Sequence, residues 1–218
     1  MTGIISGSVT RDEVTAVEVP QFHPPQENLI DYVSGRGGDG WELVIDAHLS
    51  LCATCRAEVV RLKALGGALL EKLPAEDLPE GMEDRVLDLL DSAEITTFPG
   101  SKCERSTSLP RSIERLLPDN FEDINWCSRD TKGTDSVGLP VQSVNMLLLR
   151  IPAGITVFLG QEQHTEAGQL LILTGGLVNE DMRLSIGDVK PLSELNEDFY
   201  AEGETSSTYC LLLIQDEA

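Results

Sequence analysis

The amino-acid sequence predicts an α+β protein with a helical first half and an antiparallel β second half. In the first half, apolar residues recur at spacings of three and four, which is typical of amphipathic helices. In the second half, short apolar runs follow one another, separated by turns rich in Pro, Gly, Asn and Asp. Runs at this density with no helical stretch among them predict an antiparallel sandwich or barrel. We therefore expect two domains joined by a linker.

The composition limits the classes of partner. A chain of 218 residues with 41% hydrophobic residues can bury real cores, so global disorder is not expected. Its 37 acidic and 16 basic residues give a formal net charge of −21, and only 5% of residues are aromatic. Such a field repels a phosphate backbone, which argues against direct nucleic-acid binding. A basic protein partner fits better, although solubility alone also explains the acidity.

The sequence also predicts a cytoplasmic protein. No apolar run reaches the length of a membrane span, and the first residues, MTGIISGSVTRDEV, lack the basic-then-apolar order of a secretion signal. The five cysteines are an odd number, and two of them have CxxC spacing. This usage is typical of a reducing compartment, where thiols remain available for metal or redox chemistry.

The predicted helical domain covers residues 23–93 and follows a flexible arm, residues 1–22. A short apolar face of Leu29, Ile30 and Val33 ends at the turn GRGGDG. A second face then places His48 and Cys52 one helical turn apart, and a third stripe is formed by Val59, Leu62, Leu65, Leu69 and Leu70. A fourth helix is predicted in GMEDRVLDLLDSA. This helix is short, so it needs a surface to pack on, from this chain or from another.

Residues 94–110 carry turn formers without an apolar period, which predicts the linker, and residues 111–218 form the predicted β domain. Its strands are expected in five runs, SVNMLLLRIP, ITVFLG, GQLLILTGGLV, RLSIGDVKPL and STYCLLLIQ. Cys210 lies in the last run and is expected to pack in the core. Cys103 and Cys127 have no spacing partners.

The stretch HLSLCATC, His48 to Cys55, offers one imidazole and two thiols, which are the ligands that zinc prefers. Two cysteines at CxxC spacing can point at one ion, and His48 lies one helical turn before Cys52. His23 lies just upstream of the first helix and can supply a fourth ligand. The sequence predicts a Zn²⁺ site of His23, His48, Cys52 and Cys55. The alternatives are an incidental cysteine pair, or a redox motif of the kind that needs a βαβ setting, which residues 24–73 do not supply.

The segment AHLSLCATCRAEV, with LGGALLEKL after it and His23 upstream, resembles the ChrR-type zinc-binding anti-sigma factors. The resemblance implies an N-terminal zinc-binding anti-sigma domain followed by a cupin-like β-barrel. It also implies a transcription regulator that sequesters an extracytoplasmic-function-type sigma factor and releases it on an oxidative stress signal. The helix Met82–Ala93 would help to wrap that partner. The zinc would be structural because a site closed by four protein ligands leaves no position for a substrate, so the protein is not expected to be an enzyme.

The predicted β domain departs from the metal-binding cupin pattern. Aligned on Gly175 and Gly176, the two histidine positions become Gln163 and Thr165, the glutamate position becomes Gln169, and the later histidine falls near Phe199. His164 is one place out of register and, in a strand, would point to the opposite face. A second metal is therefore not expected. The rival hypotheses are a metal-dependent cupin enzyme that uses His164 with Glu162 or Glu166, and a zinc-stabilised protein-interaction scaffold.

Overall fold

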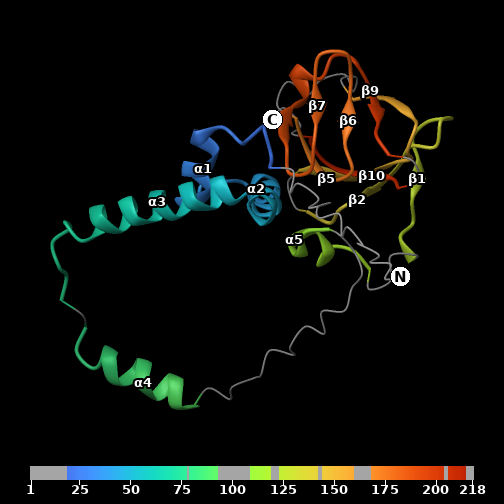
Figure 1. The fold of residues 1–218 in the computed structure, drawn as a ribbon. Helices are drawn as coiled ribbons and strands as arrows, with labels where there is room; N and C mark the ends of the chain where they lie inside the picture. The colour runs from blue at the N-terminus through green and yellow to red at the C-terminus, as the bar shows by residue number, and fades with distance from the viewer. Residues whose placement is uncertain are drawn as a thin grey trace, which may run out of the picture.

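The computed structural model describes residues 19–77, 79–92, 109–118, 123–141, 144–159, 168–203 and 206–214. Helices come first along the chain and two antiparallel sheets come second (Figure 1). This arrangement confirms the predicted α+β class, with a cupin-like β domain. The two sheets face each other as a sandwich and not as one closed barrel. Most of the predicted arm and linker lies outside the described residues.

The helical part is built on three helices that share a small core. Their bounds, with those of two further helices, are α1 (Gln26–Val33), α2 (Asp39–Leu51), α3 (Ala53–Leu70), α4 (Met82–Ser92) and α5 (Arg111–Glu114). The apolar side chains of α1, α2 and the first turns of α3 converge on one cluster that includes Leu29, Ile45 and Val59. No described helix is both long enough and apolar enough to cross a membrane.

The strands form two sheets with antiparallel pairing throughout the described residues. The larger sheet has the order β1-β2-β3-β10-β5-β8, and the smaller has the order β4-β9-β6-β7. Their bounds are β1 (Cys127–Ser128), β2 (Asp135–Gly138), β3 (Asn145–Ile151), β4 (Thr156–Phe158), β5 (Gln169–Thr174), β6 (Leu177–Val178), β7 (Arg183–Leu184), β8 (Val189–Pro191), β9 (Asp198–Ala201) and β10 (Thr208–Ile214). Each of the five predicted runs contains at least one strand. Strands β1, β2 and β9 and the short helix α5 were not predicted.

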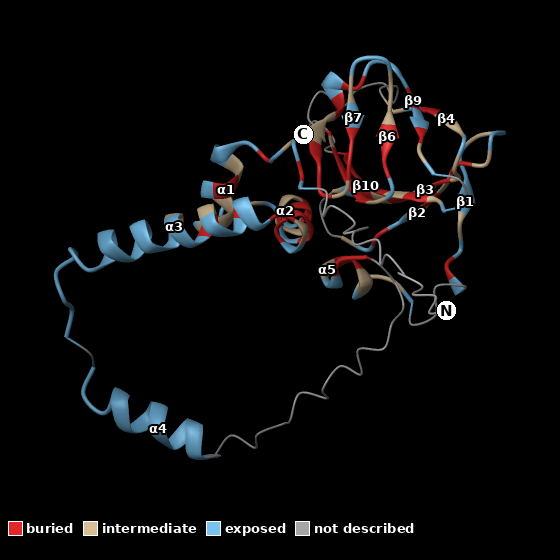
Figure 2. Ribbon diagram, viewed as in Figure 1, coloured by how far each residue is buried: buried red, intermediate tan, exposed pale blue. Residues whose placement is uncertain are grey.

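The central strand β10 is buried on both faces because each face meets a different layer (Figure 2). Its Cys210 and Leu212 point into the core between the sheets, which confirms the packing role predicted for Cys210. Its Leu211 and Leu213 lie on the outer face and pack with Val44 of α2 and with α5. The larger sheet, with β10 at its centre, therefore separates the core of the sandwich from the helical part.

Helix α2 lies directly against the β domain. A Cβ atom added at Gly40 would lie 2.6 Å from Val144 Cγ2 and 2.7 Å from Leu213 Cδ1, so the absence of a side chain allows this close approach. Helix α2 also contacts α5, α1 and α3. The same helix therefore belongs to the helical core and to the outer layer of the larger sheet.

Candidate metal centre

The structure brings together all four residues that the sequence predicted as zinc ligands. Their ligand atoms lie within 4.8 Å of one another, and this is the only such group of three or more His, Cys, Asp and Glu side chains found among the described residues. His23 precedes α1, His48 lies in the last turn of α2, Cys52 lies between α2 and α3, and Cys55 lies in the first turn of α3. Their role as ligands stays a prediction.

The local backbone explains why the two thiols converge. Helix α2 ends where the Cys52 amide donates to the His48 carbonyl at 2.8 Å, and Cys52 itself is extended. Cys52 then caps α3, because its Sγ accepts a hydrogen bond from the Cys55 amide at 3.4 Å. The cap turns both sulfur atoms toward the same side of the helix start.

The distances match a tetrahedral zinc site. The Nδ1 atom of His23 lies 3.5 Å from Cys52 Sγ and 3.4 Å from Cys55 Sγ. With ordinary Zn–S and Zn–N bond lengths, a tetrahedron separates sulfur and nitrogen by about 3.6 Å. These three groups therefore have the separations that one shared ion requires.

His48 is oriented for the same ion. Its ring is fully buried, and its Nδ1 lies 2.6 Å from the Gly187 carbonyl, to which the Nδ1–H donates. That bond leaves the lone pair on Nε2, which is buried and has no hydrogen-bond partner among the described residues. Metal-bound histidines typically donate their other ring N–H in this way. The four residues therefore fit a divalent cation held by two sulfur and two nitrogen atoms.

Burial sets the protonation of these groups in the absence of an ion. Burial lowers the pKa of His48, so its lone pair is available at neutral pH. Burial, together with the neighbouring Cys52, raises the pKa of Cys55 to about 12. A bound cation reverses the preference of a thiol, because it stabilises the thiolate directly.

The β domain supplies a second layer of contacts that sequence reasoning did not predict. Asp188 is buried, and its Oδ1 accepts hydrogen bonds from the amides of Gln21 at 2.6 Å and Phe22 at 2.8 Å. Its Oδ2 accepts from the Ser185 amide at 2.6 Å. The Val189 amide also donates to the Phe22 carbonyl at 3.0 Å. The residues just before His23 are thus attached to the β domain.

Gly187 completes this contact. Its φ of +90° is in the left-handed region, and a Cβ atom there would lie 2.5 Å from Pro20 Cγ and 3.2 Å from Leu51 Cβ. The turn Ser185–Asp188 therefore touches both the segment that carries His23 and the helix end that carries His48. The sequence predicted only a turn between strands here and no contact with the helical part.

Two of the residues that the sequence alignment placed at cupin ligand positions lie within the described part of the chain. Phe199 in β9 is 1% exposed and belongs to the core between the sheets. Gln169 begins β5, and its Oε1 is buried without a partner among the described residues. Gln163, His164 and Thr165, together with Glu162 and Glu166, lie outside the described residues.

Comparisons with known proteins agree with this architecture. No protein-family model matches the chain. The anti-sigma-E factor ChrR of Cereibacter sphaeroides is 28% identical over 171 residues, which is 78% of either chain. A crystal structure of Rhodobacter sphaeroides SigE in complex with the anti-sigma ChrR matches with a TM-score of 0.73 and 26% identity, over 90% of this chain and all of that one.

Fold and site together define a class of protein in which a helical module with a His/Cys cluster that could hold a metal ion is joined to a cupin-like β domain. Within that class, the chain is a homologue of the anti-sigma factor ChrR. The resemblance seen in the sequence is therefore confirmed.

Proposed function

We propose that this protein is an anti-sigma factor that binds an alternative sigma factor of the extracytoplasmic-function type and keeps it from RNA polymerase. The proposal is supported by the homology to ChrR, whose crystal structure contains the sigma factor SigE. The likeness extends over both parts of the chain and is not restricted to the β domain.

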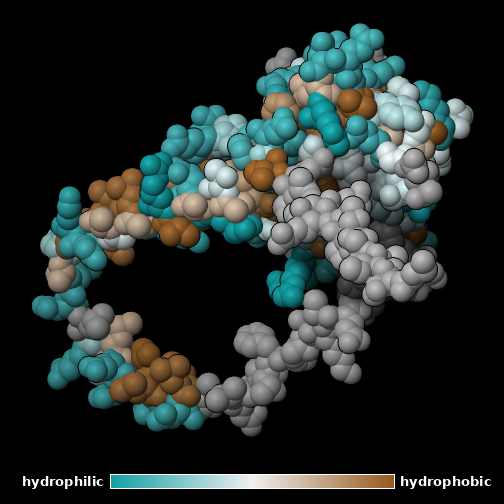
Figure 3. Space-filling view, in the orientation of Figure 1, coloured by the Kyte–Doolittle hydropathy of each residue, from teal (hydrophilic) through white to brown (hydrophobic). Residues whose placement is uncertain are grey.

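The observation that carries the proposal is the exposed apolar face of α4. Leu89 is 68% exposed and Leu90 is 67% exposed, and Met82, Val86 and Leu87 of the same helix are also exposed. Helix α4 is drawn away from the rest of the molecule, and its apolar atoms form a patch in the space-filling view (Figure 3). An isolated helix of this length is marginal in water, so it needs a surface to pack on.

The C-terminal half of α3 presents a second exposed apolar surface. Val59 is buried and Leu62 is partly buried, whereas Leu65, Leu69 and Leu70 are exposed. Among the described residues, only the first part of this predicted apolar stripe is therefore covered by other side chains. Contiguous exposed apolar surface of this kind typically marks a protein–protein interface.

The net charge of −21 also fits such a partner. Sigma factors carry basic surfaces for promoter DNA, and complementary charge accelerates association. The apolar helices would provide affinity, and the acidic surface would provide a fast encounter.

The proposal also covers the identity of the metal, its sensitivity to oxidation and the location of the protein. The metal is Zn²⁺, which the four ligands hold as a structural ion that ties the start of α1, the end of α2 and the start of α3 together. Oxidation of Cys52 and Cys55 removes two ligands, loosens this joint and releases the partner. The protein acts in the cytoplasm, where its partner and RNA polymerase are located.

The role is not catalytic. This is supported by the sequence alignment, which puts Phe199 and Gln169 at two cupin ligand positions, and by the homologue, which is an anti-sigma factor. We also propose the division into residues 1–22, 23–93, 94–110 and 111–218, with the metal centre at the contact between the two domains.

The test is a reporter driven by an extracytoplasmic-function-type sigma factor from the same organism. Co-expression of the wild-type chain should silence the promoter, and the double variant Leu89→Asp/Leu90→Asp should restore its activity because it breaks the apolar face. Tyr200→Asp is the control, since Tyr200 is also a large exposed hydrophobic residue but lies in the β domain. A fully active promoter in the presence of abundant wild-type protein contradicts the proposal.

A further inference from the structure

The four candidate metal ligands differ in how far solvent reaches them. His48 and Cys52 are 0% exposed and Cys55 is 4% exposed, whereas His23 is an exposed residue. The Nδ1 atom of His23 lies 3.5 Å from Cys52 Sγ and 3.4 Å from Cys55 Sγ. The two imidazole rings meet edge to face, with 5.7 Å between their centroids. The His23 ring therefore lies between solvent and the other three ligands.

His23 follows a short segment, residues 19–22, which we call the strap. The strap runs from the β domain toward α1 (Figure 1). The Asp188 carboxylate accepts hydrogen bonds from the amides of Gln21 at 2.6 Å and Phe22 at 2.8 Å. The Phe22 carbonyl in turn accepts from the amide of Val189, the first residue of β8, at 3.0 Å. Since β8 is the last strand in the order of the larger sheet, the strap is attached along one edge of that sheet.

The Phe22 side chain holds the strap from a second direction. Its ring packs against the core between the sheets. The Lys190 Nζ lies 4.4 Å from the centroid of the same ring, a position in which a cation and an aromatic face attract each other. Lys190 is also paired with Glu194, which keeps its ammonium group in place. The ring is thus held independently of Asp188 and of the metal ligands.

Prolines couple the backbone of His23 to the strap. Pro20 and Pro24 are buried, and Pro25 is the N-cap residue of α1. Proline fixes its own φ and also restricts the residue before it. The backbone of His23 therefore has little freedom between the strap and α1, and a large displacement of its ring is coupled to release of the strap.

We infer that the strap and His23 form a gate over the metal centre. An ion, a chelator or a thiol reagent reaches Cys52 and Cys55 when the strap leaves the β domain and takes the His23 ring with it. His48 is unsuited to this role, because its ring is fully buried and is bonded to the Gly187 carbonyl at 2.6 Å. The inference rests on the zinc site proposed above and not on binding of a sigma factor. It gives the β domain control over the rate at which the metal enters and leaves.

A gate differs in its kinetics from a residue that only supports a ligand. Loosening a gate increases the population of the open form in both the zinc-loaded and the metal-free protein, so that release and uptake of zinc both become faster. Loosening a support lets the ligand leave more readily, which accelerates release but not uptake. Measurement of both rates therefore distinguishes the two roles.

The test is stopped-flow measurement of zinc release from the full-length protein to excess chelator, and of zinc uptake by the metal-free protein. Phe22→Ala removes the ring from the β domain but keeps Asp188 and all four candidate ligands. Loss of a partly buried ring should accelerate release about tenfold, and uptake should also become faster. Alkylation of the peptide that contains Cys52 and Cys55 by iodoacetamide, measured by mass spectrometry, should accelerate in parallel.

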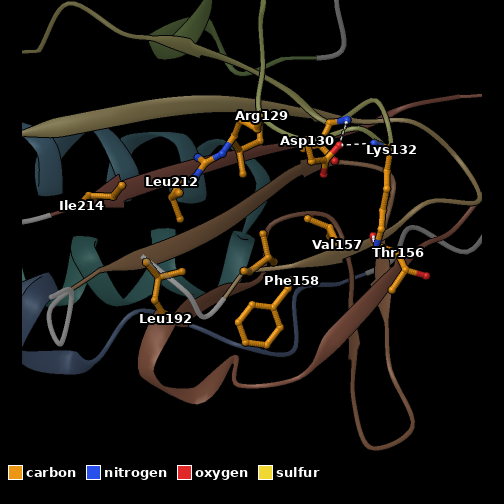
Figure 4. Close-up of a pocket in the computed structure, with 12 residues that line it drawn as sticks. Arg129, Asp130, Lys132, Thr156, Val157, Phe158, Leu192, Leu212 and Ile214 are labelled. Carbon is orange, nitrogen blue, oxygen red and sulfur yellow. Dashed lines mark hydrogen bonds between the residues drawn. The ribbon is translucent and has the colours of Figure 1, made fainter. Parts of the chain in front are cut away.

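A second variant keeps the test independent of one substitution. Lys190→Met retains an unbranched side chain but removes the charge over the Phe22 ring, so both rates should rise about threefold. Phe158→Ala is the matched control, because Phe158 lines a cavity of the β sandwich to which neither the strap nor the metal ligands contribute (Figure 4). It should leave both rates unchanged.

Folding of each variant is checked by circular dichroism, and zinc content is measured first. Wild-type protein without bound zinc would contradict the proposed site, and the gate with it. With zinc bound to the folded variants, two results overturn the gate alone. Faster release without faster uptake would make Phe22 only a support for His23. Unchanged rates in Phe22→Ala and Lys190→Met would show that the His23 ring turns away without release of the strap.

Discussion

At the residue scale, Asp188 organises one side of the candidate metal centre without belonging to the proposed ligand set. It is buried in the β domain and accepts hydrogen bonds from the backbone amides of Gln21, Phe22 and Ser185. Its neighbour Gly187 accepts from the His48 ring. Both histidines are therefore held in place through two adjacent residues, which lie more than 130 positions away in the chain.

We predict that Asp188→Asn weakens zinc binding. An amide keeps one acceptor oxygen but turns an NH₂ group toward a backbone N–H donor, so at least one of the three bonds is lost. Loss of a group that hydrogen-bonds a metal ligand typically costs 10–100-fold in affinity. Asp188 acts one step further out, through the backbone before His23, so we expect a loss of about tenfold in a competition assay with a chromogenic chelator.

The matched control for this variant is Asp181→Asn, since Asp181 is exposed in the turn between β6 and β7. It should bind zinc as the wild-type protein does. If folded Asp188→Asn retains the wild-type zinc affinity, the β domain does not position the histidines.

A second prediction concerns the thiol ligands. Cys55→Ser replaces a thiolate by a hydroxyl, a poor zinc ligand, and Cys55 also belongs to the core of α1, α2 and α3. Zinc content measured by atomic absorption should fall from one ion per chain to a small fraction of that. The helical part should then unfold at lower temperature, because structural zinc contributes about 10 kcal/mol or more in small zinc modules.

Cys127→Ser serves as the control, because Cys127 is exposed in β1. It should retain full zinc content and the wild-type unfolding temperature. Equal zinc content in Cys55→Ser and the wild-type protein would rule out the proposed ligand set.

At the scale of single elements, α4 differs from the other helices in having no buried residue among those described. We predict that its backbone amides exchange with deuterium within seconds in the free protein, because the helix opens without breaking a core. On addition of the sigma factor the same amides should become protected. Hydrogen exchange read by mass spectrometry checks this, with the amides of the buried strand β10 as an internal reference that should be slow in both states. Equal exchange of α4 in both states would remove it from the interface.

The elements also show which parts of the fold could be predicted from sequence. The apolar periods of α1 to α4 and the long buried strands β3, β5 and β10 were clear, because each buries a repeated pattern. Strands β2 and β9 were missed because they are four residues long and alternate buried with more exposed positions. Both strands lie between two others in their sheets. Short strands of this kind are defined by their neighbours and not by their own composition.

At the scale of the whole molecule, the two halves meet at the metal centre. The His-x-x-x-Cys-x-x-Cys spacing predicted three candidate ligands, because they lie within two turns of one another. The contribution of the turn Ser185–Asp188 could not be predicted, since it depends on how α2 packs on the larger sheet. The exchange of cupin ligands for Gln169 and Phe199, which rests on alignment at two glycines, stays a prediction.

The two thiols of the candidate zinc site lead to a prediction for oxidation. Peroxide should release zinc from the free protein, detectable as a coloured complex with a metal indicator, and should release the sigma factor from the complex over the same period. Loss of the two thiolate ligands is the common cause. Retention of the sigma factor after complete zinc release would separate the metal from partner binding.

The most direct test of the central claim is to measure the association of the purified, zinc-loaded chain with the sigma factor by sedimentation and titration calorimetry. We predict a complex of one chain with one sigma factor and a dissociation constant that rises at least tenfold in Leu89→Asp/Leu90→Asp. The absence of a complex between the two folded proteins, with zinc present and the thiols reduced, would contradict the account.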